Sequence, residues 1–158
     1  MTTTDSQFGE LTLVATDLGL RAVKWPAELA RRVPLPDELT VAPDHPVLSA
    51  ALLQLREYFD GERTEFDLLF DLRGTEFQEM AWRALGSIPY GATTTYGRQA
   101  ERIGRPTATR AIGAANGRNP ISIILPCHRV IGANGDLTGF AGGIDTKRRL
   151  LAFEVANT

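Results

Sequence analysis

The residues that decide the fold are TTTYGRQAERIGRPTATRAIGAANG, positions 93–117. The run of threonines favours a short extended piece, and the pattern from Tyr96 to about Ile103 predicts a helix. Residues 104–106, Gly-Arg-Pro, break this helix, because proline cannot continue it and glycine suits a turn. A second helix is predicted over residues 107–116, with a glycine after it. Helix, short turn and helix in this order indicate a helix-turn-helix motif.

Downstream lies the only cysteine of the chain, Cys127, within ISIILPCHRV at positions 121–130. We expect residues 121–125 to form a buried strand that stops at a proline just before the thiol. A nucleophile needs such a setting, because its thiolate must be formed, aimed and shielded. The base would be His128, reached through a bridging water, because neighbouring side chains of an extended segment point to opposite faces. A buried, inert thiol is the alternative, since free cysteine is among the most buried residue types.

The chain divides into two predicted domains, residues 1–74 and 75–158. Alternating and helically spaced apolar residues predict the elements of the first domain. In order, they are a hairpin over residues 8–25, a proline-rich loop with room for one short strand over 26–43, a helix capped by Asp44 and ended by Gly61, and a strand over 66–71. This mixture indicates a small α/β sheet domain.

The second domain is expected to begin with a helix from Thr75 to Gly86, because Thr75 and Gln78 have the spacing of a capping box. A glycine-rich loop over residues 132–143 follows the cysteine segment, and we expect Asp145 to cap a last helix after it. Helices and short strands around a helix-turn-helix are typical of a winged-helix-like domain. The whole chain is therefore assigned to the α/β (α+β) class.

The composition is that of a folded globular protein, with 43% apolar and 8% aromatic residues. One cysteine permits neither an intramolecular disulfide nor a thiolate zinc cluster, and the sequence contains no other metal-ligand cluster or phosphate-binding glycine motif. The first residues do not have the pattern of a signal peptide, and no stretch approaches the ~20 apolar residues of a membrane span. We therefore expect a cytoplasmic protein without membrane contact, whose thiol stays reduced.

The charge is distributed unevenly, although the net charge is only −2. Residues 1–79 hold 7 basic and 15 acidic side chains, whereas residues 80–158 hold 10 basic and 4 acidic ones. This asymmetry indicates a polyanionic partner for the second half, with two solvated surfaces as the alternative. The basic residues of the central span are all arginines, which suit phosphate contacts: Arg98, Arg102, Arg105, Arg110, Arg118 and Arg129.

Taken together, these motifs resemble the O6-alkylguanine-DNA alkyltransferases, a family of suicide DNA-repair proteins. The resemblance covers residues 75–154 and rests on Tyr96, Asn119-Pro120, Pro126-Cys127-His128-Arg129-Val130 and Glu154. It implies a ribonuclease-H-like first domain with a structural role and a winged-helix-like second domain that is catalytic and binds DNA. It also implies irreversible transfer of an alkyl group to Cys127 from guanine O6, with O4-alkylthymine as a further candidate. No cofactor is required, because the substrate supplies the alkyl group.

The family's catalytic residues match five positions of this chain. Cys127, His128 and Glu154 would form a relay that joins thiol, water, imidazole and carboxylate, with the carboxylate orienting the base. Asn119 would fix the turn that presents the thiol, and Tyr96 would donate its hydroxyl to N3 of the leaving purine. From the residues alone, Glu154 also fits a solvated helix end, Asn119 a plain Asn-Pro turn and Tyr96 a packed helix start.

The resemblance assigns DNA binding to the second helix of the helix-turn-helix. Arg110 matches an arginine finger that fills the gap left by a flipped-out base. Thr107 and the small residues Gly113, Ala114 and Ala115 would lie against the sugar–phosphate backbone in the minor groove of double-stranded DNA. On their own, the small residues also fit tight packing against a core.

The substrate pocket implied by the resemblance is walled by the glycine-rich loop. Its residues are Val130, Phe140, Ala141 and Gly142, and backbone groups around them would bond the guanine. Many relatives carry Tyr and Ser in place of Phe140 and Ala141, which leaves the preferred alkyl group open. Arg129 is expected in a buried ion pair rather than in contact with substrate.

Three other functions compete with this interpretation. A winged-helix binder of alkylated DNA without repair activity would lack the reactive cysteine, which is present here. A transcription regulator would carry a cysteine-rich metal domain, and a thiol hydrolase would need a base across the cleft. The only other histidine, His45, precedes a proline at a helix start and is expected at the surface. We expect a monomer that can cluster on DNA through its acidic first domain.

Overall fold

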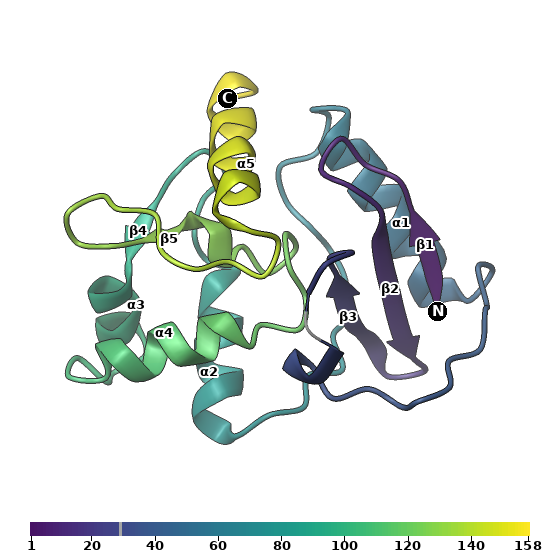
Figure 1. Ribbon diagram of the computed structural model, residues 1–158, viewed down its shortest axis with the longest axis horizontal. Coiled ribbons are helices and arrows are strands. Elements are labelled where there is room, and N and C mark those ends of the chain that lie inside the picture. Colours follow the sequence, from purple (N-terminus) through teal and green to yellow (C-terminus); the bar gives the residue numbers. More distant parts are fainter. Residues whose placement is uncertain (29) are drawn as a thin grey trace. The chain divides into compact units, whose positions relative to one another are not determined.

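The computed structural model describes residues 1–28 and 30–158 of the chain. Contacts divide the chain into two compact units, Met1–Leu72 and Arg73–Thr158 (Figure 1). Helices and strands occur in both units, which confirms the mixed α/β class, and each unit buries its own apolar side chains.

The first unit is a three-stranded antiparallel sheet with one long helix (Figure 1). Strand β2 (Leu11–Thr16) lies between β1 (Thr2–Thr4) and β3 (Gly19–Lys24). Helix α1 (Pro46–Phe59) packs on β2 and β3 and turns its apolar side to the core. The core side chains from these elements include Leu11, Leu13, Leu20, Val23, Leu48, Leu55 and Tyr58.

The hairpin predicted over residues 8–25 is confirmed as β2 and β3. β1 has no sequence signal of its own, because three threonines carry no alternation; it forms by pairing with the edge of β2. The strand predicted over residues 66–71 is wrong. Within that segment a single parallel bridge joins Phe70 to Leu20, and the rest of its backbone is irregular.

Two further expectations fail in the first unit. In the described part of residues 26–43 there is no strand, and the chain forms the 3₁₀ turn η1 (Ala30–Arg32). The N-cap of α1 is His45 and not Asp44, because the imidazole Nδ1 of His45 accepts a hydrogen bond from the Val47 N–H at 3.2 Å. This contact leaves His45 half-buried.

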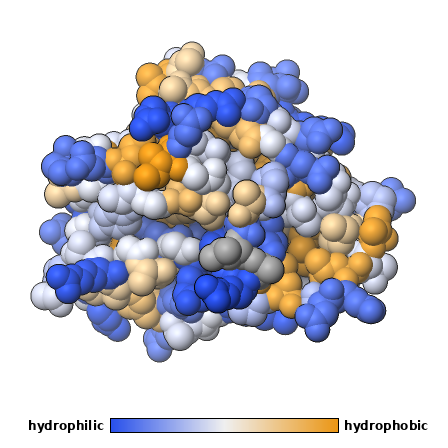
Figure 2. Space-filling model, in the orientation of Figure 1, coloured by the Kyte–Doolittle hydropathy of each residue, from blue (hydrophilic) through white to orange (hydrophobic). Residues whose placement is uncertain are grey.

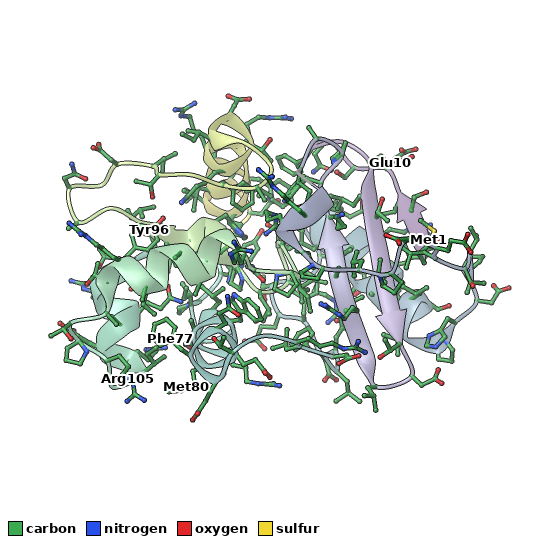
Figure 3. The ribbon with its side chains drawn as sticks, turned by 60° about the horizontal axis from the view of Figure 1, so that its bottom comes forward. Met1, Glu10, Phe77, Met80, Tyr96 and Arg105 are labelled. Carbon is green, nitrogen blue, oxygen red and sulfur yellow. The ribbon has the colours of Figure 1, made fainter. Side chains whose placement is uncertain are left out.

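The second unit packs helices around a short parallel sheet. Its elements in chain order are α2 (Glu76–Leu85), β4 (Thr94–Thr95), α3 (Tyr96–Arg102), α4 (Thr109–Gly117), the 3₁₀ turn η2 (Cys127–Arg129), β5 (Val130–Ile131) and α5 (Ile144–Ala156). β4 and β5 pair in parallel, although the sequence predicts no strand at β5. Phe77 and Tyr96 (Figure 3) pack against the core cluster between α2, α3 and α4, which consists of Ala81, Ala100, Ile112 and Ala115.

The predicted helix-turn-helix is confirmed as α3 and α4, with α4 beginning at Thr109 rather than at Thr107. A buried amide pair joins the two helices. Gln99 Nε2 donates to Asn116 Oδ1 at 3.0 Å, and Asn116 Nδ2 donates to Gln99 Oε1 at 2.8 Å. Reciprocal bonding satisfies both buried amides, so it fixes how the helices pack instead of weakening the core.

Both ends of α2 agree with the sequence prediction, whereas the start of α5 does not. The capping box is confirmed: Thr75 Oγ1 accepts from the Gln78 N–H at 3.1 Å, and Gln78 Oε1 accepts from the Thr75 N–H at 3.0 Å. Gly86 is the C-cap of that helix, as predicted. Asp145, however, lies in the first turn of α5, and the N-cap is Gly143, whose φ of 92° suits glycine.

The surface is mixed in polarity. On the face drawn in Figure 2, apolar patches are separated by hydrophilic side chains. The large apolar side chains that are exposed are Leu18, Val41, Leu53, Leu69, Ile144 and Val155. Among the helices of the described residues, none has the length and apolar content that a membrane span requires.

Candidate active site

The segment before the thiol is a buried turn and not the predicted strand. Residues 121–125 are all buried, but the Leu125 N–H donates to the Ile121 carbonyl at 3.0 Å, which closes a turn. Ile123 has a φ of 74°, an unfavourable conformation for a β-branched residue. The apolar run misleads because a buried strand and a buried turn hide the same side chains.

Asn119 holds this turn together through its side chain. It is fully buried; its Nδ2 donates to the Leu125 carbonyl at 2.8 Å, and its Oδ1 accepts from the Ile121 N–H at 3.0 Å. One amide therefore replaces the strand partners that this backbone would otherwise need.

Cys127 begins the 3₁₀ turn η2 and is 8% exposed. Its N–H donates to the Leu125 carbonyl at 2.8 Å, and the Arg129 N–H donates to the Pro126 carbonyl at 3.0 Å. Thiol and imidazole thus belong to one tight turn. The segment is therefore not extended, and the expectation that the Cys127 and His128 side chains point to opposite faces, which rests on an extended segment, is wrong.

Glu154 on α5 brings the polar side chains of this turn together. Its Oε2 lies 2.7 Å from His128 Nε2, and its Oε1 accepts from Arg129 Nε at 2.7 Å. A second guanidinium nitrogen of Arg129 reaches Oε2 at 3.0 Å, and a third donates to the Ile88 carbonyl at 2.7 Å. The buried ion pair predicted for Arg129 is confirmed, and Glu154 is fully buried rather than a solvated helix end.

The electrostatics of this cluster fix its protonation. Burial lowers the pKa of His128, against the bond and the charge of Glu154, which raise it. Burial alone would raise the pKa of Glu154, but hydrogen bonds from His128 and Arg129 and their charges lower it to about 2. At neutral pH Glu154 is therefore ionised, and it serves His128 as an acceptor.

Lys147, two helical turns before Glu154 on α5, is a buried cation. It is 1% exposed, and its ammonium donates to the Val130 carbonyl at 2.7 Å and to the Thr138 carbonyl at 3.2 Å. Burial lowers the pKa of Lys147, while the charge of Cys127 raises it. The positive charge of Lys147 therefore acts on the thiol and favours its thiolate form.

Tyr96 and the glycine-rich loop meet at Thr138. The Tyr96 hydroxyl lies 2.5 Å from Thr138 Oγ1, so the first residue of α3 is hydrogen-bonded to the loop (Tyr96 is labelled in Figure 3). The Tyr96 ring packs against the helical core, which fixes the direction of its hydroxyl.

The expected pocket residues surround the same cluster. The Phe140 ring meets the His128 ring edge-on, with centroids 6.4 Å apart. Ala141 and Gly142 are half-buried, and Val130 is fully buried with its carbonyl bonded to Lys147. The Val130 carbonyl at the edge of the expected pocket is therefore already engaged by a buried ammonium.

The residues expected to bind DNA lie on or next to α4. Arg110, Thr107 and Ala114 are exposed, and Gly113 is half-buried. Ala115 differs: its side chain is 3% exposed and packs in the core, so it offers little surface to a ligand. The alternative of tight packing therefore describes Ala115, whereas Gly113 and Ala114 remain accessible.

The sequence motifs do not identify two residues of the site, Lys147 and Thr138. A signal exists only for Lys147, which is spaced seven positions from Glu154 and so shares its helix face. Among the residues that the structure describes, there is no group of three or more His, Cys, Asp or Glu side chains that could hold a metal ion.

This arrangement has counterparts among known proteins. The family model of the 6-O-methylguanine DNA methyltransferase ribonuclease-like domain matches residues 1–72, and that of the DNA binding domain of the same family matches residues 76–156. The chain therefore belongs to the 6-O-methylguanine DNA methyltransferase family, which confirms the resemblance, the ribonuclease-like first domain and the DNA-binding type of the second.

Similar proteins cover nearly the whole chain. A methylated-DNA–protein-cysteine methyltransferase of Mycobacterium tuberculosis is 51% identical over 152 residues, which span 96% of this chain and 90% of the relative. One of Methanosarcina acetivorans is 46% identical over 150 residues, spanning 95% and 94%. The crystal structure of Mycobacterium tuberculosis OGT in complex with DNA superimposes with a TM-score of 0.89 at 49% identity, covering 99% of this chain and 92% of that one.

Proposed function

We propose that Cys127 accepts the alkyl group when this chain repairs O6-alkylguanine in DNA by direct reversal. The chain is a methylated-DNA–protein-cysteine methyltransferase and binds damaged DNA. The single observation that supports the acceptor role is the joining of the turn that carries Cys127 to a buried His128–Glu154 pair. A binding module without repair activity is not favoured, because the thiol is intact.

The thiol is activated through His128. Because Glu154 is ionised and can only accept, neutral His128 carries its hydrogen on Nε2 and presents the lone pair of Nδ1. Nδ1 is buried and has no hydrogen-bond partner among the described residues. A water between Nδ1 and the thiol would pass the proton from sulfur to the imidazole, and the Lys147 charge would favour the resulting thiolate.

The transfer is a displacement at carbon. The sulfur of Cys127 forms a bond to the alkyl carbon while the bond from that carbon to guanine O6 breaks, and the electron pair of that bond stays with the purine. Tyr96 donates a hydrogen bond at purine N3 as the base becomes more basic, and the proton lost by the thiol finally restores neutral guanine. The product is a thioether, which is not readily hydrolysed, so each protein molecule reacts once.

DNA would be held by α4 through the minor groove. Thr107, Gly113 and Ala114 offer small or hydroxylated surface for a close sugar–phosphate backbone, and Arg110 is free of the core to fill the gap of a flipped base. The flipped guanine would enter beside Phe140, Ala141 and Gly142. These side chains lack hydroxyls, so recognition would use backbone groups; O4-alkylthymine is a second candidate substrate.

The remaining expectations belong to the same proposal. Residues 75–158 would carry catalysis and DNA binding, and residues 1–74 would be structural. The chain would work in the cytoplasm as a monomer, where its thiol stays reduced, and several copies could cluster on DNA. The reaction would need no cofactor, because the substrate supplies the alkyl group.

Intact-mass spectrometry tests the proposal. The protein is mixed with duplex DNA that contains one O6-methylguanine, next to Cys127→Ser and to undamaged DNA. We expect a single methyl mass gain that saturates at one per protein and is absent from the variant. A wild-type protein that binds this DNA without gaining mass would refute the acceptor role and leave a damage-binding module.

A further inference from the structure

The hydroxyl that the proposed mechanism needs is engaged within the protein. The Tyr96 hydroxyl and Thr138 Oγ1 are 2.5 Å apart. Either hydroxyl can donate in this pair, and because a phenol is a stronger acid than an aliphatic alcohol, the favoured donor is Tyr96 and the favoured acceptor is Thr138. A purine N3 that is to receive the Tyr96 proton must therefore take the place of Thr138.

The position of Thr138 is itself fixed by the active site. Its carbonyl accepts from the buried ammonium of Lys147 at 3.2 Å, and the same ammonium holds the Val130 carbonyl at 2.7 Å, directly after the Cys127 turn. Thr138 thus links α3, α5 and the glycine-rich loop. Its backbone stays tied to Lys147 while its side chain, which is exposed, is free to turn to another rotamer.

We propose that Thr138 is a latch on Tyr96: it holds the tyrosine hydroxyl in the free protein and must release it before the guanine is bound productively. Thr138 is then a positioning residue that lowers the rate of transfer, because substrate binding breaks one hydrogen bond within the protein. The proposal rests on the role of Tyr96 in the proposed function and adds the control of that role by the loop.

The size of the effect follows from one ordinary hydrogen bond. Thr138→Val keeps the shape of the side chain and removes its hydroxyl. Without the latch, the second-order rate of methyl transfer should rise by about two- to tenfold, the factor that corresponds to the net strength of a single neutral hydrogen bond. Thr138→Ser retains a hydroxyl and should remain slower than Thr138→Val.

The test is a double-mutant cycle with Tyr96→Phe, measured as methyl transfer from O6-methylguanine duplex DNA to Cys127 under single-turnover conditions. Thr138→Val should accelerate the wild-type protein and should change the rate little in the Tyr96→Phe background, where no hydroxyl is left to release. Asn134→Ala is the matched control: it removes the Asn134–Asp136 hydrogen bond of the same loop without touching Tyr96, and it should not accelerate transfer.

Each outcome is decisive. A Thr138→Val protein that reacts no faster than wild type, or an acceleration of the same size in the Tyr96→Phe background or in Asn134→Ala, overturns the latch. Failure of the underlying mechanism looks different: a wild-type protein that gains no methyl refutes Cys127 as acceptor, and a Tyr96→Phe protein as fast as wild type refutes the role of Tyr96.

Discussion

Glu154→Gln is the change whose effect on stability the structure defines most sharply. The Glu154 side chain is 1% exposed and accepts hydrogen bonds from His128 at 2.7 Å and from Arg129 at 2.7 and 3.0 Å. Glutamine has the same shape but no charge, and its amide nitrogen would face an N–H donor of His128 or Arg129. The substitution therefore leaves the Arg129 guanidinium buried without its counter-ion.

Two routes give the same magnitude. Hydrogen bonds and charges from His128 and Arg129 lower the pKa of Glu154 from its ordinary value to about 2, and a shift of that size corresponds to roughly 3 kcal/mol of folding free energy at neutral pH. Removing one partner of a buried ion pair typically destabilises a protein by about 3–5 kcal/mol. For a chain of this length, we expect Glu154→Gln to lower the melting temperature by about 7–14 °C.

Urea denaturation at pH 7 and pH 3 measures this effect. Because the folded pKa of Glu154 is depressed, its contribution is fully present above pH 4.5 and is lost as the pH falls through about 2. The difference between wild type and Glu154→Gln should therefore shrink by about 2 kcal/mol at pH 3. Glu101→Gln, the same change at an exposed helix position, should alter stability by less than about 0.5 kcal/mol.

The reasoning is refuted if Glu154→Gln destabilises the protein by less than about 1 kcal/mol at pH 7, since no buried ion pair would then be broken. A difference that stays constant between pH 7 and pH 3 would also refute it. In that case the depressed carboxyl pKa would not be the source of the stability.

Three further predictions concern single residues. Lys147→Met removes a positive charge that acts on the thiol, so the pH profile of Cys127 alkylation by iodoacetamide should move to higher pH. Arg148→Met, at an exposed position of the same helix, should leave the profile unchanged. Equal profiles for the two variants would contradict the effect of Lys147 on the thiol. Asn119→Ala removes both hydrogen bonds by which the buried amide closes the turn, the one to the Leu125 carbonyl and the one from the Ile121 N–H, and should reduce the unfolding free energy by about 2–4 kcal/mol in urea; a loss under about 1 kcal/mol would show that the turn closes without the amide. Thr75→Ala removes the capping box of α2 and should cost about 1 kcal/mol in thermal unfolding, whereas Thr75→Ser should retain most of that stability.

The parts of the fold that the sequence predicts correctly are set by local rules. Thr75 and Gln78 form their capping box because both partners lie within one helical turn. The helix-turn-helix is correct for the same reason, since glycine and proline mark its turn and each helix is short. Even here Ala108, not an earlier residue, is the N-cap of α4, and no side chain there marks the boundary.

The parts that fail depend on long-range contacts. Residues 121–125 satisfy every local criterion of a buried strand, but the side chain of Asn119 takes the backbone bonds that a neighbouring strand would make. The strand predicted over residues 66–71 likewise forms one bridge to Leu20 and no ladder. Whether a backbone finds a strand partner is a property of the packed fold, and alternation of apolar residues does not encode it.

The chemistry of the site shows the same division between local and distant information. Cys127 and His128 are adjacent in sequence, so a motif is enough to find them, whereas the groups that set their protonation come from α5. Lys147 and Glu154 are seven residues apart, about 10.5 Å along the axis of a helix. Both contact the segment that follows Cys127: Glu154 bonds His128, and Lys147 bonds the Val130 carbonyl. One helix face therefore bonds the His128 imidazole and holds a buried cation at the Val130 carbonyl, so a small change in how α5 packs would alter both contacts at once. Both charged side chains are fully buried, so each must keep its hydrogen-bond partners, and this requirement fixes how α5 packs on the cysteine turn.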